Sequence, residues 1–485
     1  MSRRTKIINV GEITSPTTLQ RAASRIEEEP VTPLGRPNNI SEVKKELFSA
    51  RDCAGIQQDL NLTQTKTKVL LRGVRCVGGS KTIIEKNAYK TIQDRNHRLD
   101  EFFELRQLTY RRVDKEDQVA KNVEVPTIVC SDLPGLIEKV MEEREREDSE
   151  SILIKISIDG GGGFLKFCTS IFDIEDPSPR MNTGMSRKFL ESGVKRVLII
   201  GLAPNVSEDY VNVKRIWLDC GIDKLRKYTI ATDLKLCNVL LGMMNHSSCH
   251  PCAWCDVKKE FMHRKGKQRT IASLMKLFFD FFDSRKDKKD AKYYGNVIHP
   301  PMICDDVSDN TPVICVIPPP ELHLLIGPVN KMSTELESLW PASEEWLKSC
   351  NVKKEEYHGG TFAGNDSRQL LRNVNRLEAL RPPEACKKFV NAFKSFNDVV
   401  SACYGSNLDA DYLQKISIFA ADYFRLGISV TPKVHAVIYH IPEFCELMGR
   451  GLGPWSEQTG ESVHHDFKEM WQRYKVKDET RPIYG

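Results

Sequence analysis

Short apolar runs alternate with amphipathic segments between residues 151 and 248. Four runs have the length and the β-branched character of strands, and they cover residues 152–158, 164–171, 195–202 and 227–232. Apolar residues at helical spacing predict helices at 207–219 and 234–244. The order strand, strand, strand, helix, strand, helix predicts an α/β domain whose first strands form an antiparallel meander.

The pattern becomes mostly helical between residues 249 and 450. Segments with one apolar face are expected to form helices at 271–282, 333–347, 385–400 and 409–426. A charged loop at 283–292 and a proline turn at 318–320 interrupt this region. The simplest organisation is a helical insertion, 249–450, within an α/β domain that begins at 151–248.

The first 150 residues differ from the rest of the chain. Residues 1–40 are polar and rich in Pro, Thr, Arg and Glu, which predicts a disordered arm. Residues 41–150 are expected to form a small helical module, and their many Lys and Arg residues make it either a DNA-binding surface or an ordinary solvated helical face. The charged run 142–151 is interpreted as a linker.

The amino-acid composition excludes few classes of protein. The chain has 485 residues with 71 Lys and Arg against 66 Asp and Glu, and its net charge of +5 permits nucleic-acid binding without requiring it. The apolar runs are too short for a membrane span, which needs about 20 residues, and the N-terminus lacks a signal peptide pattern, so we expect an intracellular protein that binds no membrane. Fifteen scattered cysteines favour reduced thiols and metal sites over disulfides.

Two aspartates follow predicted strands directly. Asp159 ends an apolar strand and precedes Gly160–Gly163, and Asp233 stands between a strand and a helix. A carboxylate at the end of a strand, beside open backbone, suits a divalent metal. The glycines alternatively form only a tight turn, and Asp233 alternatively serves only as a helix N-cap. If the two strands are neighbours, both carboxylates can bind the same ion.

Cysteine and histidine pairs predict a zinc site. Cys252 and Cys255 form a C-x-x-C, and His435 and His440 form an H-x₄-H far downstream. Two thiolates and two imidazoles complete a tetrahedral zinc site. The C-x-x-C alone is also compatible with a redox motif or a chance pair, and the neighbouring Cys249-His250 provides substitute ligands.

The segment 451–485 carries two glutamates and a basic tail. Glu457 and Glu461 are four residues apart, so they share one face of a helix. Alternatively, a glutamate near the start of a helix serves only to stabilise that helix, because its negative charge interacts favourably with the helix dipole. The adjacent His464 and His465 point apart on a helix, which favours contacts with solvent or DNA over metal binding.

Taken in order, these features resemble the catalytic subunit of the V(D)J recombinase and the Transib- and ProtoRAG-type transposases related to it. That family has an Asp-Gly-x-Gly element, a second aspartate before a C-x-x-C, an H-x₄-H followed by Pro-Glu, and a Gly-x-Trp segment before a Glu-Ser. The matching positions are Asp159–Gly162, Asp233, Cys252 with Cys255, His435 with His440, Pro442-Glu443, Gly453-Pro454-Trp455 and Glu461-Ser462.

The resemblance covers about two-thirds of the chain, and it implies an RNase H-like core interrupted by the helical zinc-binding insertion. It assigns Asp159, Asp233 and Glu461 as the catalytic triad for two Mg²⁺ or Mn²⁺ ions, and Cys252, Cys255, His435 and His440 as structural zinc ligands. It further implies DNA strand cleavage and transfer in the nucleus, by a homodimer with an accessory recombinase subunit.

Gly163 departs from the family, which has an acidic residue there, and no RING-type cysteine array precedes the core. A domesticated, non-catalytic DNA-binding protein of the same fold and a metal-dependent nuclease without strand transfer are the alternatives.

Overall fold

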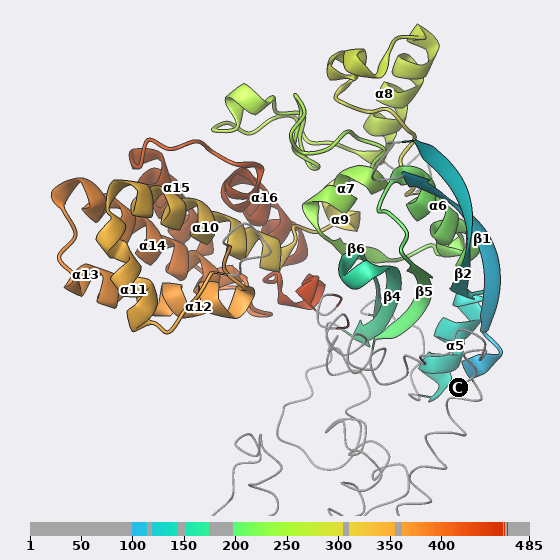
Figure 1. Cartoon of the computed structure of the whole chain (residues 1–485), viewed down its shortest axis with the longest axis horizontal. Helices are drawn as coiled ribbons and strands as arrows, with labels where there is room; N and C mark the ends of the chain where they lie inside the picture. Colours follow the sequence, from blue (N-terminus) through green and yellow to red (C-terminus); the bar gives the residue numbers. More distant parts are fainter. Residues whose placement is uncertain are drawn as a thin grey trace, which may run out of the picture. The chain divides into compact units, whose positions relative to one another are not determined.

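The computed structural model describes residues 99–113, 119–143, 152–173, 197–303, 310–354, 361–458, 460 and 463 (Figure 1). All described residues belong to one unit of the chain, Lys90–Gly485. The predicted arm at 1–40, the predicted module up to residue 98, and Glu461, His464 and His465 lie outside the described residues.

The described strands form a six-stranded mixed sheet in the order β1-β2-β5-β4-β3-β6. Their bounds are β1 Phe103–Val113, β2 Ala120–Cys130, β3 Ile152–Asp159, β4 Phe164–Asp173, β5 Leu198–Pro204 and β6 Thr229–Thr232. Neighbouring strands are antiparallel except β3 and β6, which are parallel. The predicted mixed α/β class and the antiparallel meander β3-β4-β5 are therefore confirmed.

The prediction of a helical module over residues 41–150 is wrong for residues 103–130. These residues form the long hairpin β1-β2, which joins the main sheet through β5. Leu108 and Tyr110 on β1 are buried, whereas their sequence neighbours are exposed, and β2 alternates in the same way. This period of two is typical of a sheet with one covered face. Arg106, Arg111 and Arg112 therefore lie on a strand.

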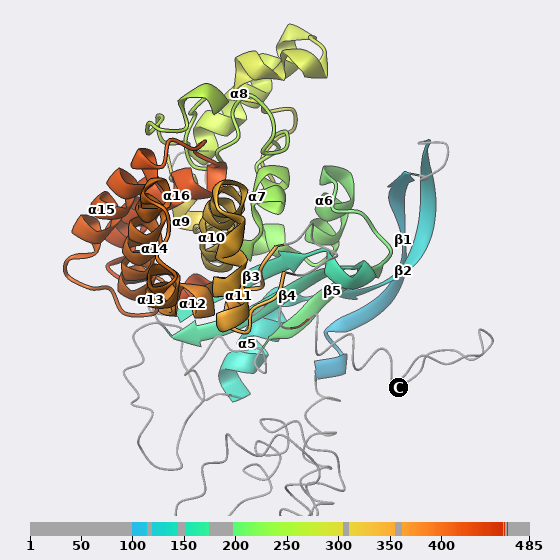
Figure 2. The same cartoon turned by 60° about the vertical axis from the view of Figure 1, so that its left-hand side comes forward.

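Helices cover both faces of the sheet. Figure 2 shows α6 (Tyr210–Asp219) and α7 (Leu234–Leu240) on one side and α5 (Leu133–Glu143) on the other. Asn212 of α6 fixes the edge strand, because its side-chain amide accepts a hydrogen bond from the N–H of Arg111 and donates one to the Arg111 carbonyl, both at 2.8 Å. Gly201 of β5 lets α6 approach, since a Cβ there would lie 2.7 Å from Ile216.

The region from residue 271 to 448 is mainly helical, in agreement with the sequence. Its helices are α8 Ile271–Ser284, α9 Val313–Val316, α10 Glu321–Leu339, α11 Glu344–Ser349, α12 Gly364–Arg372, α13 Val374–Ala379, α14 Glu384–Cys403, α15 Tyr412–Arg425 and α16 Pro432–Met448. The single helix expected at 333–347 is wrong: α10 begins directly after the proline turn and ends before Pro341, which cannot continue a helix. No helix among the described residues is long and apolar enough to cross a membrane.

Short segments connect this helical region to the sheet. The helix α9 contacts both β6 and α16, and the 3₁₀ turn Gly453–Trp455 after α16 contacts β6. Trp254, next to Cys255, is buried and donates its indole N–H to the carbonyl of Ile317, 2.7 Å away. The chain after α16 thus returns to the sheet edge that carries β3 and β6.

Candidate metal centre and active site

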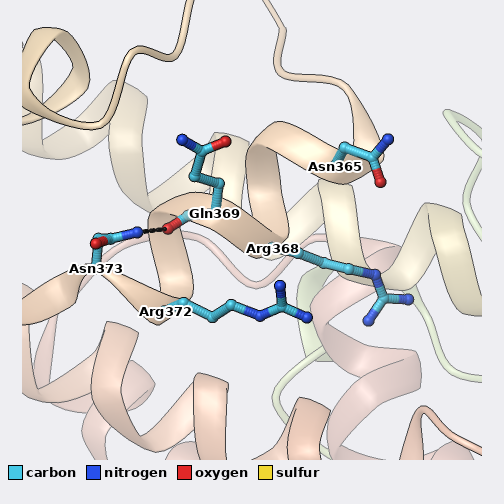
Figure 3. A pocket seen from close by; sticks show the side chains of 5 residues that line it. All are labelled: Asn365, Arg368, Gln369, Arg372 and Asn373. Atoms are coloured by element: carbon cyan, nitrogen blue, oxygen red, sulfur yellow. Dashed lines mark hydrogen bonds between the residues drawn. The ribbon is translucent and has the colours of Figure 1, made fainter. Parts of the chain in front are cut away.

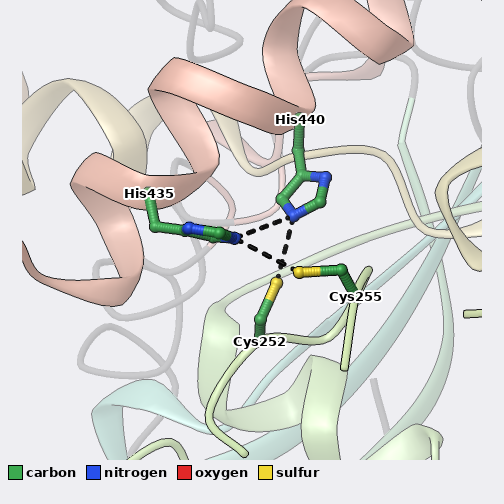
Figure 4. A group of neighbouring side chains, drawn as sticks. All are labelled: Cys252, Cys255, His435 and His440. Atoms are coloured by element: carbon green, nitrogen blue, oxygen red, sulfur yellow. Dashed lines mark hydrogen bonds between the residues drawn. The ribbon is translucent and has the colours of Figure 1, made fainter. Parts of the chain in front are cut away.

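The four predicted zinc ligands converge in the structure. Cys252 Sγ lies 3.2 Å from His440 Nε2, Cys255 Sγ lies 3.3 Å from His435 Nε2, and the two Nε2 atoms are 3.2 Å apart. All four side chains are buried, and their ligand atoms lie within 4.8 Å of one another (Figure 4). A loop after α7 supplies the cysteines and α16 supplies the histidines, so the cluster joins distant parts of the chain.

The donor set fits a tetrahedral zinc ion. Zn–N and Zn–S bonds of about 2.0–2.3 Å place neighbouring ligand atoms roughly 3.3–3.8 Å apart, close to the separations in this cluster. Hydrogen bonds from Cys252, His435 and His440 lower the pKa of Cys255, and the thiolate that they favour is the form that binds metal. The alternative ligands Cys249 and His250 do not belong to this cluster of ligand atoms.

Neighbouring groups orient the two imidazoles. The Nδ1 atom of His435 lies 2.8 Å from the carbonyl oxygen of Met262, and that of His440 lies 3.0 Å from Glu443 Oε2. These contacts leave Nε2 of each ring directed at the thiolates, as in most protein zinc sites. Glu443 follows His440 by three residues on α16, and this helical spacing was the available signal for its role.

A buried arginine forms hydrogen bonds with the backbone of the loop that carries the two cysteines. Arg269 is 2% exposed, and its Nε donates to the carbonyl oxygens of Cys252 at 3.2 Å and Cys255 at 3.0 Å. These bonds fix the loop backbone and place a positive charge beside the two cysteines. This role was not predictable from the sequence, because a lone arginine in a basic segment resembles a surface residue.

The two strand-end aspartates lie side by side. The parallel strands β3 and β6 pair Ile158 with Thr232, so Asp159 and Asp233 follow at the same end of adjacent strands. Adjacent strands are about 4.8 Å apart, which brings the two carboxylates within reach of a shared ion. Burial raises the pKa of Asp159, and the negative charge of Asp233 raises it further, against the lowering effect of Lys166.

Each aspartate also has a local structural role. Asp233 is the N-cap of α7, with Oδ1 accepting from the N–H of Leu236 at 2.7 Å, and Asp159 Oδ1 accepts from the N–H of Gly161 at 3.2 Å. The glycine run forms the expected tight turn, with positive φ at Gly162 and Gly163. The capping role of Asp233 is thus confirmed, and it leaves the second carboxylate oxygen outside the cap.

Glu457 lies inside the protein and holds a histidine. It is 4% exposed, and its Oε1 accepts from the backbone N–H of His323 at 2.9 Å and lies 3.0 Å from the Nδ1 of that ring. Burial raises the pKa of Asp159 overall, and His323 exerts only a small lowering effect on it. The sequence did not reveal the contact between Glu457 and His323.

A buried lysine fixes the segment that leads to Glu461. Lys155 of β3 is fully buried, and its Nζ donates to the carbonyl oxygens of Pro454 at 3.3 Å and Ser456 at 3.1 Å. Gly460 then lies against β3, since a Cβ there would be 3.1 Å from Ser157. Glu461 itself is outside the described residues, so its predicted role stays a prediction. A lysine within an apolar strand was the only sequence signal for this contact.

Comparison with models of protein families and with curated proteins finds no match to this chain. The resemblance to the recombinase and transposase family therefore stays a prediction based on motif order. What the geometry adds is independent of it: a buried Cys₂His₂ cluster, and two aspartates at one end of adjacent parallel strands.

Proposed function

We propose that this protein is a DNA transposase or recombinase with a two-metal DDE site, which cleaves DNA and transfers strands. The observation that carries the proposal is the pairing of Ile158 with Thr232, which brings Asp159 and Asp233 together at the end of β3 and β6. A core in which β3, β4 and β5 form an antiparallel meander and β6 adds parallel to β3 is compatible with the RNase H-like fold.

Asp159, Asp233 and Glu461 would hold two Mg²⁺ or Mn²⁺ ions, because hard carboxylate oxygens are the ligands that these ions prefer. Two such ions, when bound, activate the attacking oxygen and stabilise the leaving oxygen of a phosphodiester. The position of Gly460 against Ser157 supports including its neighbour Glu461 in this site. Glu457 and Lys155 would act by positioning, through His323 and through the backbone before Glu461.

The zinc cluster has a structural role in this proposal. It attaches α16 to the loop that follows α7, and α16 leads directly into the segment that returns to β3. A closed Cys₂His₂ set leaves no open position for a substrate, as is typical of structural zinc. Binding of zinc would therefore stabilise the route by which Glu461 reaches the two aspartates.

The wider parts of the proposal follow from the resemblance alone. They are DNA as the substrate, a nuclear location, a homodimer, and an accessory recombinase subunit. The basic tail 468–477, a second candidate DNA surface, lies outside the described residues.

Incubation of the purified chain with supercoiled plasmid and Mg²⁺, Mn²⁺ or Ca²⁺ tests the proposal. We expect nicked circles with Mg²⁺ or Mn²⁺, DNA binding without cleavage with Ca²⁺, and loss of nicking in Asp159→Asn and Asp233→Asn. Asp280→Asn on α8, an exposed carboxylate, is the matched control and should nick normally.

A labelled oligonucleotide with a free 3′-hydroxyl separates the alternatives. Joining of the label to the plasmid supports a transposase, whereas nicking without joining indicates a nuclease. Binding without nicking under every metal condition contradicts the catalytic proposal and indicates a DNA-binding protein.

A further inference from the structure

A polar hollow of about 490 Å³ lies along α12, and neither of the two aspartates lines it. Asn365, Arg368, Gln369, Arg372 and Asn373 line it, and both guanidinium groups extend in the same direction along the helix (Figure 3). Residues 365, 368, 369 and 372 share one helix face because they are three or four positions apart. The opposite face, with Leu370 and Leu371, is buried in the helical region.

The two arginines differ in their partners. Arg368 is held by an ion pair with Glu321, whose carboxylate is almost fully buried and also accepts from Ser456 Oγ at 2.7 Å. The side chain of Arg372 is exposed, and its guanidinium makes no hydrogen bond or ion pair with any other described residue. The hollow therefore contains one arginine fixed in place and one whose donors are available to a ligand.

The lining groups select an anion. The guanidinium of Arg372 and the amide of Asn365 line the hollow, and none of its lining residues is acidic. Arg368 is paired with Glu321, and the amide of Gln369 donates to the carbonyl oxygen of Cys350. The planar fork of arginine matches the oxygens of a phosphate group, which is the ligand chemistry that this surface fits.

The hollow is connected to the candidate active site by a short chain of contacts. Arg368 binds Glu321, Glu321 binds Ser456, and the next residue, Glu457, holds His323. The helices α10 and α12 meet closely at Gly364, where a Cβ would lie 2.4 Å from Leu322. These contacts link α12 to the segment that leads to Gly460, which lies against β3.

We infer that the Arg372 hollow on α12 binds a backbone phosphate of the DNA on which the carboxylate site acts. This inference rests on the proposed function for its choice of DNA over a free phosphate. Arg372 would contribute a charge-assisted contact that is independent of sequence, and Arg368 would orient the surface while remaining paired with Glu321.

DNA binding by the full chain, measured in EDTA over a series of NaCl concentrations with a fluorescent duplex, tests the inference. We expect Arg372→Gln to weaken binding about tenfold, the equivalent of one charge-assisted hydrogen bond. The slope of log K against log salt should fall by about 1, because one phosphate contact is lost. Arg372→Lys should lie between the variant and the wild type, since it keeps the charge without the fork.

Arg425→Gln on α15 is the matched control, because it removes one arginine charge from a side chain that is 71% exposed. Equal affinity and slope for the Arg372→Gln and Arg425→Gln variants would overturn the inference and leave α12 as a solvated face. Titration of inorganic phosphate into both variants distinguishes a phosphate group of DNA from a small phosphate ligand. Phosphate binding that depends on Arg372, together with unchanged DNA affinity, indicates a small phosphate ligand and overturns the choice of DNA.

The two proposals fail separately. Absence of metal-dependent nicking by the wild type contradicts the catalytic function but leaves the binding comparison in EDTA unaffected. If Arg372→Gln binds DNA with the same affinity as the wild type, the hollow does not bind a DNA phosphate, even if the wild type cleaves DNA.

Discussion

The hydroxyl of Thr232 donates a hydrogen bond of 2.8 Å to the carbonyl oxygen of Ile158, across 74 residues of sequence. This bond closes the parallel pairing of β3 and β6 at the point where both strands end. The next residue on each strand is an aspartate, so the bond fixes the two carboxylates relative to one another. The positions of the two candidate metal ligands thus depend on a hydrogen bond between two uncharged residues, Thr232 and Ile158.

Replacement of Asp233 by asparagine separates its two roles. Asn and Asp are nearly equivalent as N-caps, so the free energy of unfolding should change by no more than about 0.5 kcal/mol. DNA nicking should fall roughly a hundredfold or more, because loss of one carboxylate misaligns both reacting oxygens. Chemical denaturation and the plasmid assay measure the two quantities on one preparation. Nicking at the wild-type rate would show that Asp233 is only a cap.

Zinc should be present at about one ion per chain, and elemental analysis measures it. Cys252→Ala and His440→Ala should lose the metal and unfold at much lower denaturant concentration, because structural zinc contributes its binding energy to folding. Cys249→Ala is the control and should keep the metal, since Cys249 lies outside the cluster. Folded wild-type protein without zinc would contradict this prediction.

Removal of the Glu457 carboxylate should lower the stability of the folded protein. Glu457→Ala should lower the free energy of unfolding by roughly 2–3 kcal/mol, because His323 loses its acceptor and buried Lys155 loses a compensating charge. The exposed Glu446→Ala on α16 should change it by less than about 0.5 kcal/mol. Denaturant titration compares the two variants. Similar values for both would show that the buried contact contributes no net stability.

Lys155 should make stability depend on pH. Burial lowers the pKa of Lys155 to about 8, and the charge of Glu457 offsets only part of that effect. Between about pH 8 and 10.5 the unfolded chain binds a proton that the folded chain has released, so this group makes stability rise with pH.

The free energy of unfolding of the wild type, minus that of Lys155→Met, should therefore increase by roughly 1–3 kcal/mol from pH 7 to pH 10. Taking the difference removes the contributions of other titrating groups. A difference that stays constant or decreases over this range would show that Lys155 remains protonated in the folded protein.

Local patterns determined much of this molecule. The apolar runs predict β3 and β4 closely, because strand formation there follows from residues that are contiguous in sequence. The spacing of Cys252 with Cys255 and of His435 with His440 predicts the four residues that converge in the Cys₂His₂ cluster, because each pair lies on one short segment. The N-cap at Asp233 was likewise predictable from its position between a strand and a helix.

Tertiary structure decided the rest, because it depends on contacts between segments that are far apart in sequence. The sequence allowed β3 and β6 to be neighbours, but only the pairing of Ile158 with Thr232 puts Asp159 beside Asp233. The long hairpin β1-β2 was missed because its alternation of polar and apolar residues carries many charges on the exposed face. Lys155 and Arg269 are both buried, since backbone carbonyl groups from other segments satisfy their charged donors, and the sequence alone does not identify these partners.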